Sequence, residues 1–214
     1  MKKFILLSIL VSTFGFVNAQ KSQFGIKGGL NISNQSNSIK TLDYPQTSSP
    51  IIAFNIGGFV EIKISDNISV QPELLYSAQG GKSNSVVFLS TEDPGEFFDV
   101  ESESSLSYIN IPVMFKYYVI KEFSLDLGPQ LGVLVSSKNK LTSIGRTTGE
   151  IISGENSGDL YKSIDYGLNI GAGYAITKNI SAEIRYNLGL NNISKYASSE
   201  SKNSVFSISA CYKF

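Results

Sequence analysis

The sequence contains no histidine and no tryptophan, and its single cysteine is Cys211. Without histidine, the common Ser–His arrangements of hydrolases and acyl transferases are excluded. The same scarcity of histidine and cysteine disfavours zinc and copper sites and leaves mainly oxygen ligands, which suit calcium. We therefore predict no catalytic residue, no cofactor and no metal site, and we expect that the protein is not an enzyme.

Neither sign of charge is in excess, because 18 basic residues stand against 18 acidic ones. Nucleic-acid binders carry a basic excess that neutralises phosphates, so a nucleic-acid partner is not expected. After Val17 there is also no apolar run that approaches the roughly 20 residues of a membrane helix. If the chain resides in a membrane, it must form a closed barrel, which pairs its backbone hydrogen bonds between strands.

The N-terminus has the pattern of a signal peptide. Lys2 and Lys3 precede an apolar run over residues 4–17, and Val17-Asn18-Ala19 supplies the small residues of a cleavage site. We predict a signal peptide over residues 1–19 and one mature domain over residues 20–214. An exported chain with a single cysteine has no disulfide framework, so another feature must stabilise it.

The C-terminus alternates strictly between two faces. Phe206, Ile208, Ala210, Tyr212 and Phe214 fall on one face, and smaller or polar residues fall on the other. A period of two is typical of a strand between two environments. An alternating strand that ends on an aromatic residue resembles the terminal strand by which bacterial barrels reach the outer membrane. It implies two partners, the outer-membrane lipid and the barrel-assembly machinery, the latter through the strand that ends at Phe214.

Seven further segments alternate in the same way, which makes eight predicted strands in total. They cover residues 22–32, 51–64, 68–79, 105–119, 123–136, 163–176, 180–190 and 204–214. In each segment an almost unbroken apolar face opposes a face of glycine, serine, amides and charges. A soluble exported sandwich or a lipocalin-like barrel would also alternate, so the pattern alone leaves that alternative open.

The connections between the strands favour the membrane. Three are tight turns, at residues 65–67, 120–122 and 177–179, and they alternate with long polar connections at 33–50, 80–104, 137–162 and 191–203. Short periplasmic turns and long extracellular loops alternate in outer-membrane barrels, where aromatic belts also flank an aliphatic band. The sequence therefore predicts an all-β fold, an eight-stranded antiparallel transmembrane β-barrel in the outer membrane.

The polar face predicts charged side chains inside the barrel. These residues are Lys27, Lys63, Lys116, Arg185, Lys213, Glu61, Glu73, Asp126, Asp165 and Glu183. Eight strands enclose an interior that side chains fill, so diffusion through a pore is not expected. The charges could form a proton or ion relay, and Glu61 with Glu73 could act as acid and base. We predict instead a salt-bridged plug, because paired charges are tolerable in a narrow interior.

The segment 91–103 carries six acidic residues and no basic one. It could bind calcium or a basic partner, although its spacing does not match an EF-hand. We expect a solvated extracellular loop.

Several motifs resemble the PorT-like outer-membrane β-barrel domains of Bacteroidota. They are Phe24-Gly-Ile-Lys-Gly-Gly-Leu-Asn31, Val70-Gln-Pro-Glu-Leu-Leu-Tyr76, Tyr108-Ile-Asn-Ile-Pro-Val113 with Lys116-Tyr117-Tyr118, and Gly128-Pro-Gln-Leu-Gly132. The resemblance implies a structural or accessory protein of the envelope, or of a secretion or surface-assembly system, with a protein partner there. The alternative is a receptor or adhesin that binds ligands through its long extracellular loops.

Overall fold

The structure of the chain is a computed structural model, and it describes residues 22–39, 47–89, 96–145, 149, 151–156, 160–196 and 199–214. The predicted signal peptide, residues 1–19, lies outside the described residues. Within the described part, no helix is long and apolar enough to cross a membrane.

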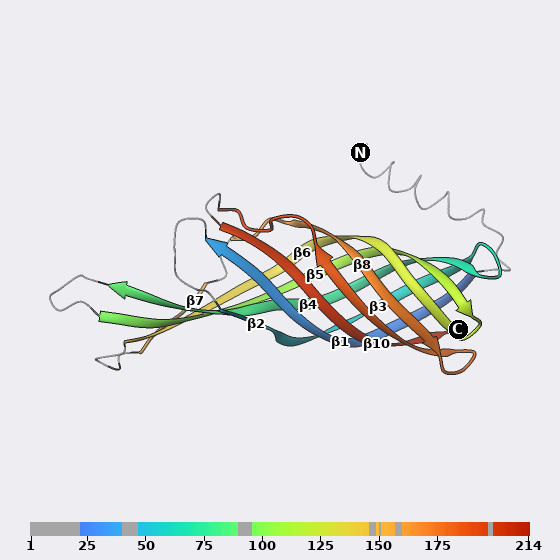
Figure 1. The fold of residues 1–214 in the computed structure, drawn as a ribbon, viewed down its shortest axis with the longest axis horizontal. Helices are drawn as coiled ribbons and strands as arrows, with labels where there is room; N and C mark the ends of the chain where they lie inside the picture. Colours follow the sequence, from blue (N-terminus) through green and yellow to red (C-terminus); the bar gives the residue numbers. More distant parts are fainter. Residues whose placement is uncertain are drawn as a thin grey trace.

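Eight strands form a closed antiparallel ring (Figure 1). They are β1 (Ser22–Ile39), β3 (Ile51–Lys63), β4 (Ile68–Leu89), β5 (Glu96–Ile120), β6 (Phe123–Gly145), β8 (Ile164–Ala175), β9 (Ile180–Gly189) and β10 (Ser199–Lys213). Around the ring the order is β4-β3-β1-β10-β9-β8-β6-β5, and pairing of β4 with β5 closes it. The predicted eight-stranded barrel is confirmed.

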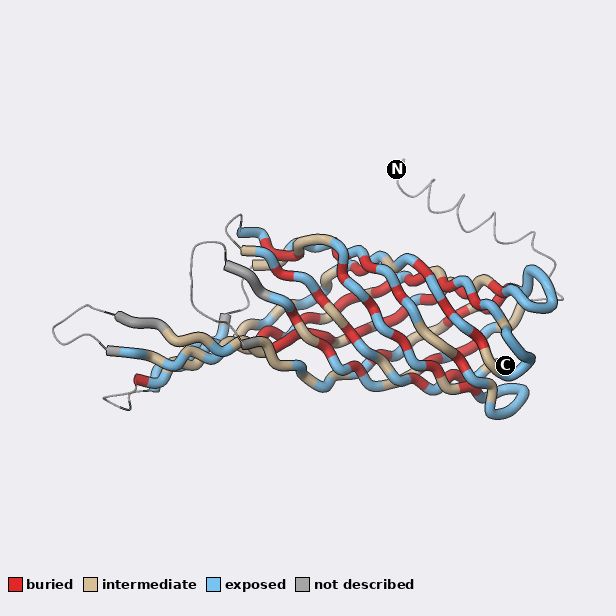
Figure 2. Tube along the Cα trace, in the orientation of Figure 1, coloured by how far each residue is buried: buried red, intermediate tan, exposed pale blue. Residues whose placement is uncertain are grey.

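The barrel is polar inside and apolar outside. In β8, Leu168 and Ile170 are exposed on the outer wall, whereas Asn169 between them is fully buried. The same alternation of buried and exposed residues runs along the other strands of the wall (Figure 2). A soluble barrel would place these faces the other way round, so the exposed apolar wall fits a lipid environment.

Two predicted loops are largely strands. The connection expected at residues 80–104 is a hairpin, in which β4 and β5 pair as far as Leu89↔Glu96. The one expected at 137–162 contains the end of β6 and a further strand, β7 (Ile151–Asn156), which pairs with β6. The one expected at 33–50 is also partly strand, because β1 continues to Ile39 and a short strand, β2 (Thr47–Ser49), adds to β4. Both faces are polar in much of this region, so the two-environment pattern that predicts strands is weak there.

These extensions form a sheet that projects beyond one end of the barrel (Figure 1). We call it the outer sheet: residues 81–89 of β4, 96–104 of β5, 138–145 of β6, and β7. It lies at the end opposite the short turns. β4 starts at the turn that follows Lys63 and ends in the outer sheet, and β5 starts in the outer sheet and ends at the turn that follows Ile120. Short turns face the periplasm in outer-membrane barrels, so the outer sheet is extracellular.

Gly80 marks the point where β4 leaves the barrel wall. Its φ of +151° is a conformation that side-chain-bearing residues rarely adopt. A Cβ added there would lie 1.9 Å from the carbonyl oxygen of Ser104. Gly80 therefore permits the close approach of β4 to β5 at the base of the outer sheet.

Candidate functional site

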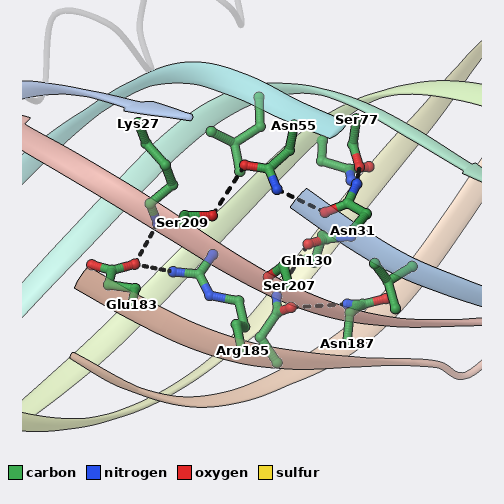
Figure 3. A pocket seen from close by; sticks show the side chains of 14 residues that line it. Lys27, Asn31, Asn55, Ser77, Gln130, Glu183, Arg185, Asn187, Ser207 and Ser209 are labelled. Carbon is green, nitrogen blue, oxygen red and sulfur yellow. Dashed lines mark hydrogen bonds and ion pairs between the residues drawn. The ribbon is translucent and has the colours of Figure 1, made fainter. Parts of the chain in front are cut away.

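The centre of the barrel holds a cluster of interlocked ion pairs. Arg185 donates two hydrogen bonds to the Glu73 carboxylate, at 2.9 and 2.8 Å. Lys27 bridges Glu73 at 3.0 Å and Glu183 at 2.5 Å. Figure 3 shows Lys27, Glu183 and Arg185 converging from β1 and β9. Each of these side chains is buried, so the pairs replace hydration that the interior does not provide.

The cluster continues toward the periplasmic end. Lys116 lies 2.7 Å from Glu183 and 3.5 Å from Asp126. Glu61 is fully buried and accepts hydrogen bonds from Lys213 and from the Tyr118 hydroxyl. Four cations, Lys27, Lys116, Arg185 and Lys213, thus meet four carboxylates, Glu61, Glu73, Asp126 and Glu183.

These eight residues agree with the salt-bridged interior that the sequence predicts, but two predicted members lie elsewhere. Lys63 is exposed at the periplasmic end, where its strand finishes. Asp165 is buried, yet it accepts a hydrogen bond of 2.8 Å from Asn203, and no ion pair joins it within the described residues. The paired cluster therefore contains four cationic and four carboxylate side chains. Asp165 lies outside it and is hydrogen-bonded to the Asn203 amide.

Amides and hydroxyls fill the middle of the barrel next to the cluster. Asn55 donates to Asn31 at 2.7 Å, and Asn31 donates to Ser77 at 3.0 Å (Figure 3). Asn187 donates to Asn169 at 3.0 Å. The cavity between these side chains measures only about 30 Å³. A space of this size holds one or two water molecules and provides no continuous path.

An apolar cluster occupies the extracellular end of the interior. Leu106, Tyr108 and Ile193 are buried together, and Leu134 and Tyr161 pack against them. Burial raises the pKa of the Tyr161 phenol, whose hydroxyl shares a hydrogen bond of 2.7 Å with Ser104. Ile193 comes from the connection between β9 and β10, so that connection folds inward and closes this end.

The two carboxylates that could act as acid and base, Glu61 and Glu73, have different partners in the structure. Glu61 is engaged by Lys213 and Tyr118, whereas Glu73 is engaged by Lys27 and Arg185. The two carboxylates that could have acted together thus belong to separate ion pairs. Among the described residues, no group of three histidine, cysteine or acidic side chains is placed to hold a metal ion.

The outer sheet carries exposed apolar side chains outside the barrel wall. These side chains are Phe97, Leu141, Ile144, Ile151 and Ile152. A hollow of about 340 Å³ lies on the sheet between β4, β5 and β6. Within the described residues, β4 has no neighbour on its free side beyond Asn84, and β7 pairs only with β6.

The predicted acidic loop contributes to this sheet. Residues 91–95 lie outside the described residues, and the remainder forms the start of β5. Lys82 lies 3.1 Å from Glu103 and 3.6 Å from Glu101, and the hydrogen bond to Glu103 raises the pKa of the Lys82 ammonium. Part of the acidic charge is therefore neutralised across the β4–β5 hairpin.

Comparison with known proteins agrees with this architecture. The outer membrane protein beta-barrel domain family matches residues 18–195. The chain belongs to this family. A search of the curated proteins finds no relative of it.

Among solved structures, the chain is similar to Neisserial surface protein A, at 16% identity, 89% coverage of this chain, 97% of the other and a TM-score of 0.47. It is also similar to Ail, the attachment invasion locus protein of Yersinia pestis, at 13% identity, 91% and 99% coverage and a TM-score of 0.44. The outer membrane protease OmpT of Escherichia coli is similar at 11% identity, with 90% and 97% coverage and a TM-score of 0.35. Likenesses this distant carry no functional argument. The family and the geometry of the barrel show that the protein is a small outer-membrane β-barrel.

Proposed function

We propose that the protein is a non-conducting outer-membrane barrel that holds the outer sheet outside the cell, where the sheet binds a protein partner. One observation carries this proposal. The outer sheet exposes isoleucines and unpaired strand edges in water, far from the lipid that accounts for the apolar residues of the barrel wall.

Exposed strand edges present rows of unpaired N–H and C=O groups, and extended segments of other proteins add to such edges. Proteins that avoid this pairing place charges or proline on the edge. Here Ile151 and Ile152 begin β7 and are 66% and 54% exposed. An apolar edge costs solubility and contributes nothing to the barrel, so a partner contact explains it.

The resemblance to PorT-like barrels supports the same proposal. If the partner belongs to a secretion or surface-assembly system, the protein is an accessory component of that system, anchored by its barrel. If the partner lies on another cell, the protein is an adhesive receptor. In both cases the barrel serves as an anchor rather than an enzyme, because four of its five buried carboxylates form ion pairs and the fifth, Asp165, accepts a hydrogen bond from Asn203.

Trimming the outer sheet tests this function. Because Asn84 pairs with Glu101, residues Ser85 to Val100 can be replaced by Asn-Gly without changing the register of the hairpin. We expect the trimmed barrel to fold and reach the surface, since the barrel wall is untouched. A photo-crosslinker introduced at Ile152 should give a discrete protein adduct on intact cells, and the adduct should weaken when the hairpin is trimmed.

A crosslinker at Tyr196 is the control, because this residue is also exposed but lies outside the outer sheet. Absence of adducts from both Ile152 and Phe97 in cells with normal surface levels would contradict the proposal. Recovery of adducts from Tyr196 alone would move the contact to the β9–β10 connection.

A further inference from the structure

The periplasmic end of the barrel contains a cavity that neither the ion-paired cluster nor the outer sheet explains. It measures about 800 Å³ and opens where the three short turns meet. Pockets that bind small ligands usually measure roughly 300–1,000 Å³. We call this cavity the periplasmic mouth.

Lysines line the periplasmic mouth on all sides. Lys63 ends β3, Lys121 lies in the β5–β6 turn, Lys178 lies in the β8–β9 turn, and Lys213 ends β10. Each of the hairpin ends at this side of the barrel therefore contributes one ammonium group. A fifth lysine, Lys116, lines the inner end of the cavity.

The five lysines differ in their partners. Lys116 and Lys213 are neutralised by the interior carboxylates. Lys63, Lys121 and Lys178 are exposed, and none of them forms an ion pair within the described residues. Three unpaired ammonium groups thus surround a water-accessible cavity whose inner end is already charge-balanced.

Two acidic residues, Asp66 and Glu122, also line the mouth. Ammonium groups in excess over carboxylates complement a ligand with the opposite balance, which carries several carboxylates and fewer amines. The Ser181 hydroxyl on the wall adds a neutral hydrogen-bonding group of the kind that amides require, and the Ser124 hydroxyl, which donates to Asp126, can accept a further hydrogen bond. A short acidic peptide has this combination of groups and a size that fits the cavity.

We infer that the periplasmic mouth is a binding site for a short peptide rich in carboxylates. Lys63, Lys121 and Lys178 pair with the carboxylates, and Asp66 and Glu122 accept hydrogen bonds from an amine or amide. This inference is independent of the outer sheet, which lies at the other end of the barrel.

Binding of fluorescein-labelled tetraglutamate to the full-length protein in lipid nanodiscs, followed by fluorescence anisotropy, tests the inference. We expect saturable binding that weakens with salt, and no binding of labelled tetralysine. The triple variant Lys63→Gln, Lys121→Gln, Lys178→Gln should raise Kd about tenfold, because exposed ion pairs each contribute modestly. The matched control neutralises Lys138, Lys140 and Lys202, which are exposed beyond the opposite end of the membrane, and should leave Kd within about twofold.

Lysine acetylation followed by mass spectrometry provides a second measurement on the unmodified protein. Tetraglutamate should protect Lys63, Lys121 and Lys178 and leave Lys138 unprotected. Equal loss of affinity in both triple variants, or protection of Lys138 alone, would overturn the site. Displacement by inorganic phosphate at a lower concentration than unlabelled tetraglutamate would overturn the choice of carboxylates and assign a phosphate ligand.

Discussion

At the scale of single residues, the barrel is stabilised by a polar core in place of an apolar one. Arg185 and Glu73 illustrate how this works, because the guanidinium meets both oxygens of the carboxylate in a buried site. A buried charge that loses its partner is costly, whereas removal of both members of a pair leaves no charge uncompensated.

Replacement of Arg185 by methionine should destabilise the barrel by about 3–5 kcal/mol, because it leaves Glu73 and Glu183 with one cation fewer. The double variant Arg185→Met, Glu73→Gln should recover part of this loss, since it restores neutrality. Urea unfolding of protein refolded into lipid vesicles measures both effects.

The matched control is Arg185→Met, Glu61→Gln. Glu61 bonds with Lys213 and Tyr118 instead of Arg185, so the two changes should add. The sequence predicts coupling among Glu183, Arg185 and their neighbours, most plausibly Asp126, Lys116 or Glu61. The structure pairs Arg185 with Glu183 and Lys116 with Glu183, and it adds Glu73, which the sequence did not indicate as a partner, as the main partner of Arg185. A coupling to Glu61 as large as that to Glu73 would disprove the observed pairing.

The two faces of β9 should respond differently to substitution. Ile184 is 50% exposed on the lipid face, and Ile184→Arg should cost about 2–4 kcal/mol near the bilayer midplane. Asn187 faces the interior and donates to Asn169, so Asn187→Ser should cost only about 1 kcal/mol for the lost hydrogen bond. The same urea titration compares them, and equal costs would show that the register of β9 is wrong.

At the scale of elements, the boundary between the barrel and the outer sheet lies at Gly80. β4 pairs with β3 up to Ser77 and with β2 from Lys82, so it changes partner across this glycine. The positive φ of Gly80 and its contact with Ser104 allow that change without a break in the β4–β5 ladder.

Gly80→Ala should therefore destabilise the protein by about 1–3 kcal/mol, the usual cost of a strained backbone conformation. Gly154→Ala in β7 is the control, because a Cβ there meets nothing within 4 Å. We expect the control to change stability by less than about 0.5 kcal/mol. Thermal unfolding followed by circular dichroism gives both values, and a neutral Gly80→Ala would remove the role assigned to this glycine.

The elements of the barrel could be predicted from the sequence, whereas the outer sheet could not. In β10 the lipid imposes apolar residues at every second position up to Tyr212, which fixes both the strand and its faces. Residues 138–140 of β6 read Lys-Asn-Lys, and solvent on both sides imposes no alternation. The partners in the ion pairs could not be predicted from the sequence either, because the distance from Arg185 to Glu73 depends on the curvature and stagger of the whole ring.

At the scale of the whole molecule, three layers close the interior. The paired charges lie toward the periplasm, the amides lie in the middle, and the cluster of Leu106, Tyr108 and Ile193 lies toward the outside. Because all three layers must open before an ion can pass, we expect the barrel to be a membrane anchor that does not conduct ions.

Planar-bilayer recordings of the purified protein should show no stable single-channel steps, because the space between the amide side chains in the middle of the barrel, about 30 Å³, is too small for a hydrated path. The buffer and detergent without protein provide the baseline. Reproducible ohmic conductance above that baseline would show that the three layers open. It would support the alternative hypothesis of an ion relay along the paired charges.

The seam between β1 and β10 has a consequence for how the molecule forms. These strands pair from Gly25↔Lys213 to Ile39↔Ser199, so the ring joins segments more than 150 residues apart. The ion pairs Lys27–Glu183 and Glu61–Lys213 cross or flank this seam and come together only when the ring closes. Such long-range pairing is slow, since the entropy of closing a long loop must be overcome before the contacts form. Until the ring closes, Glu183 lacks Lys27 and Lys213 lacks Glu61. We therefore expect closure of the seam to be the step that stabilises the barrel in the membrane.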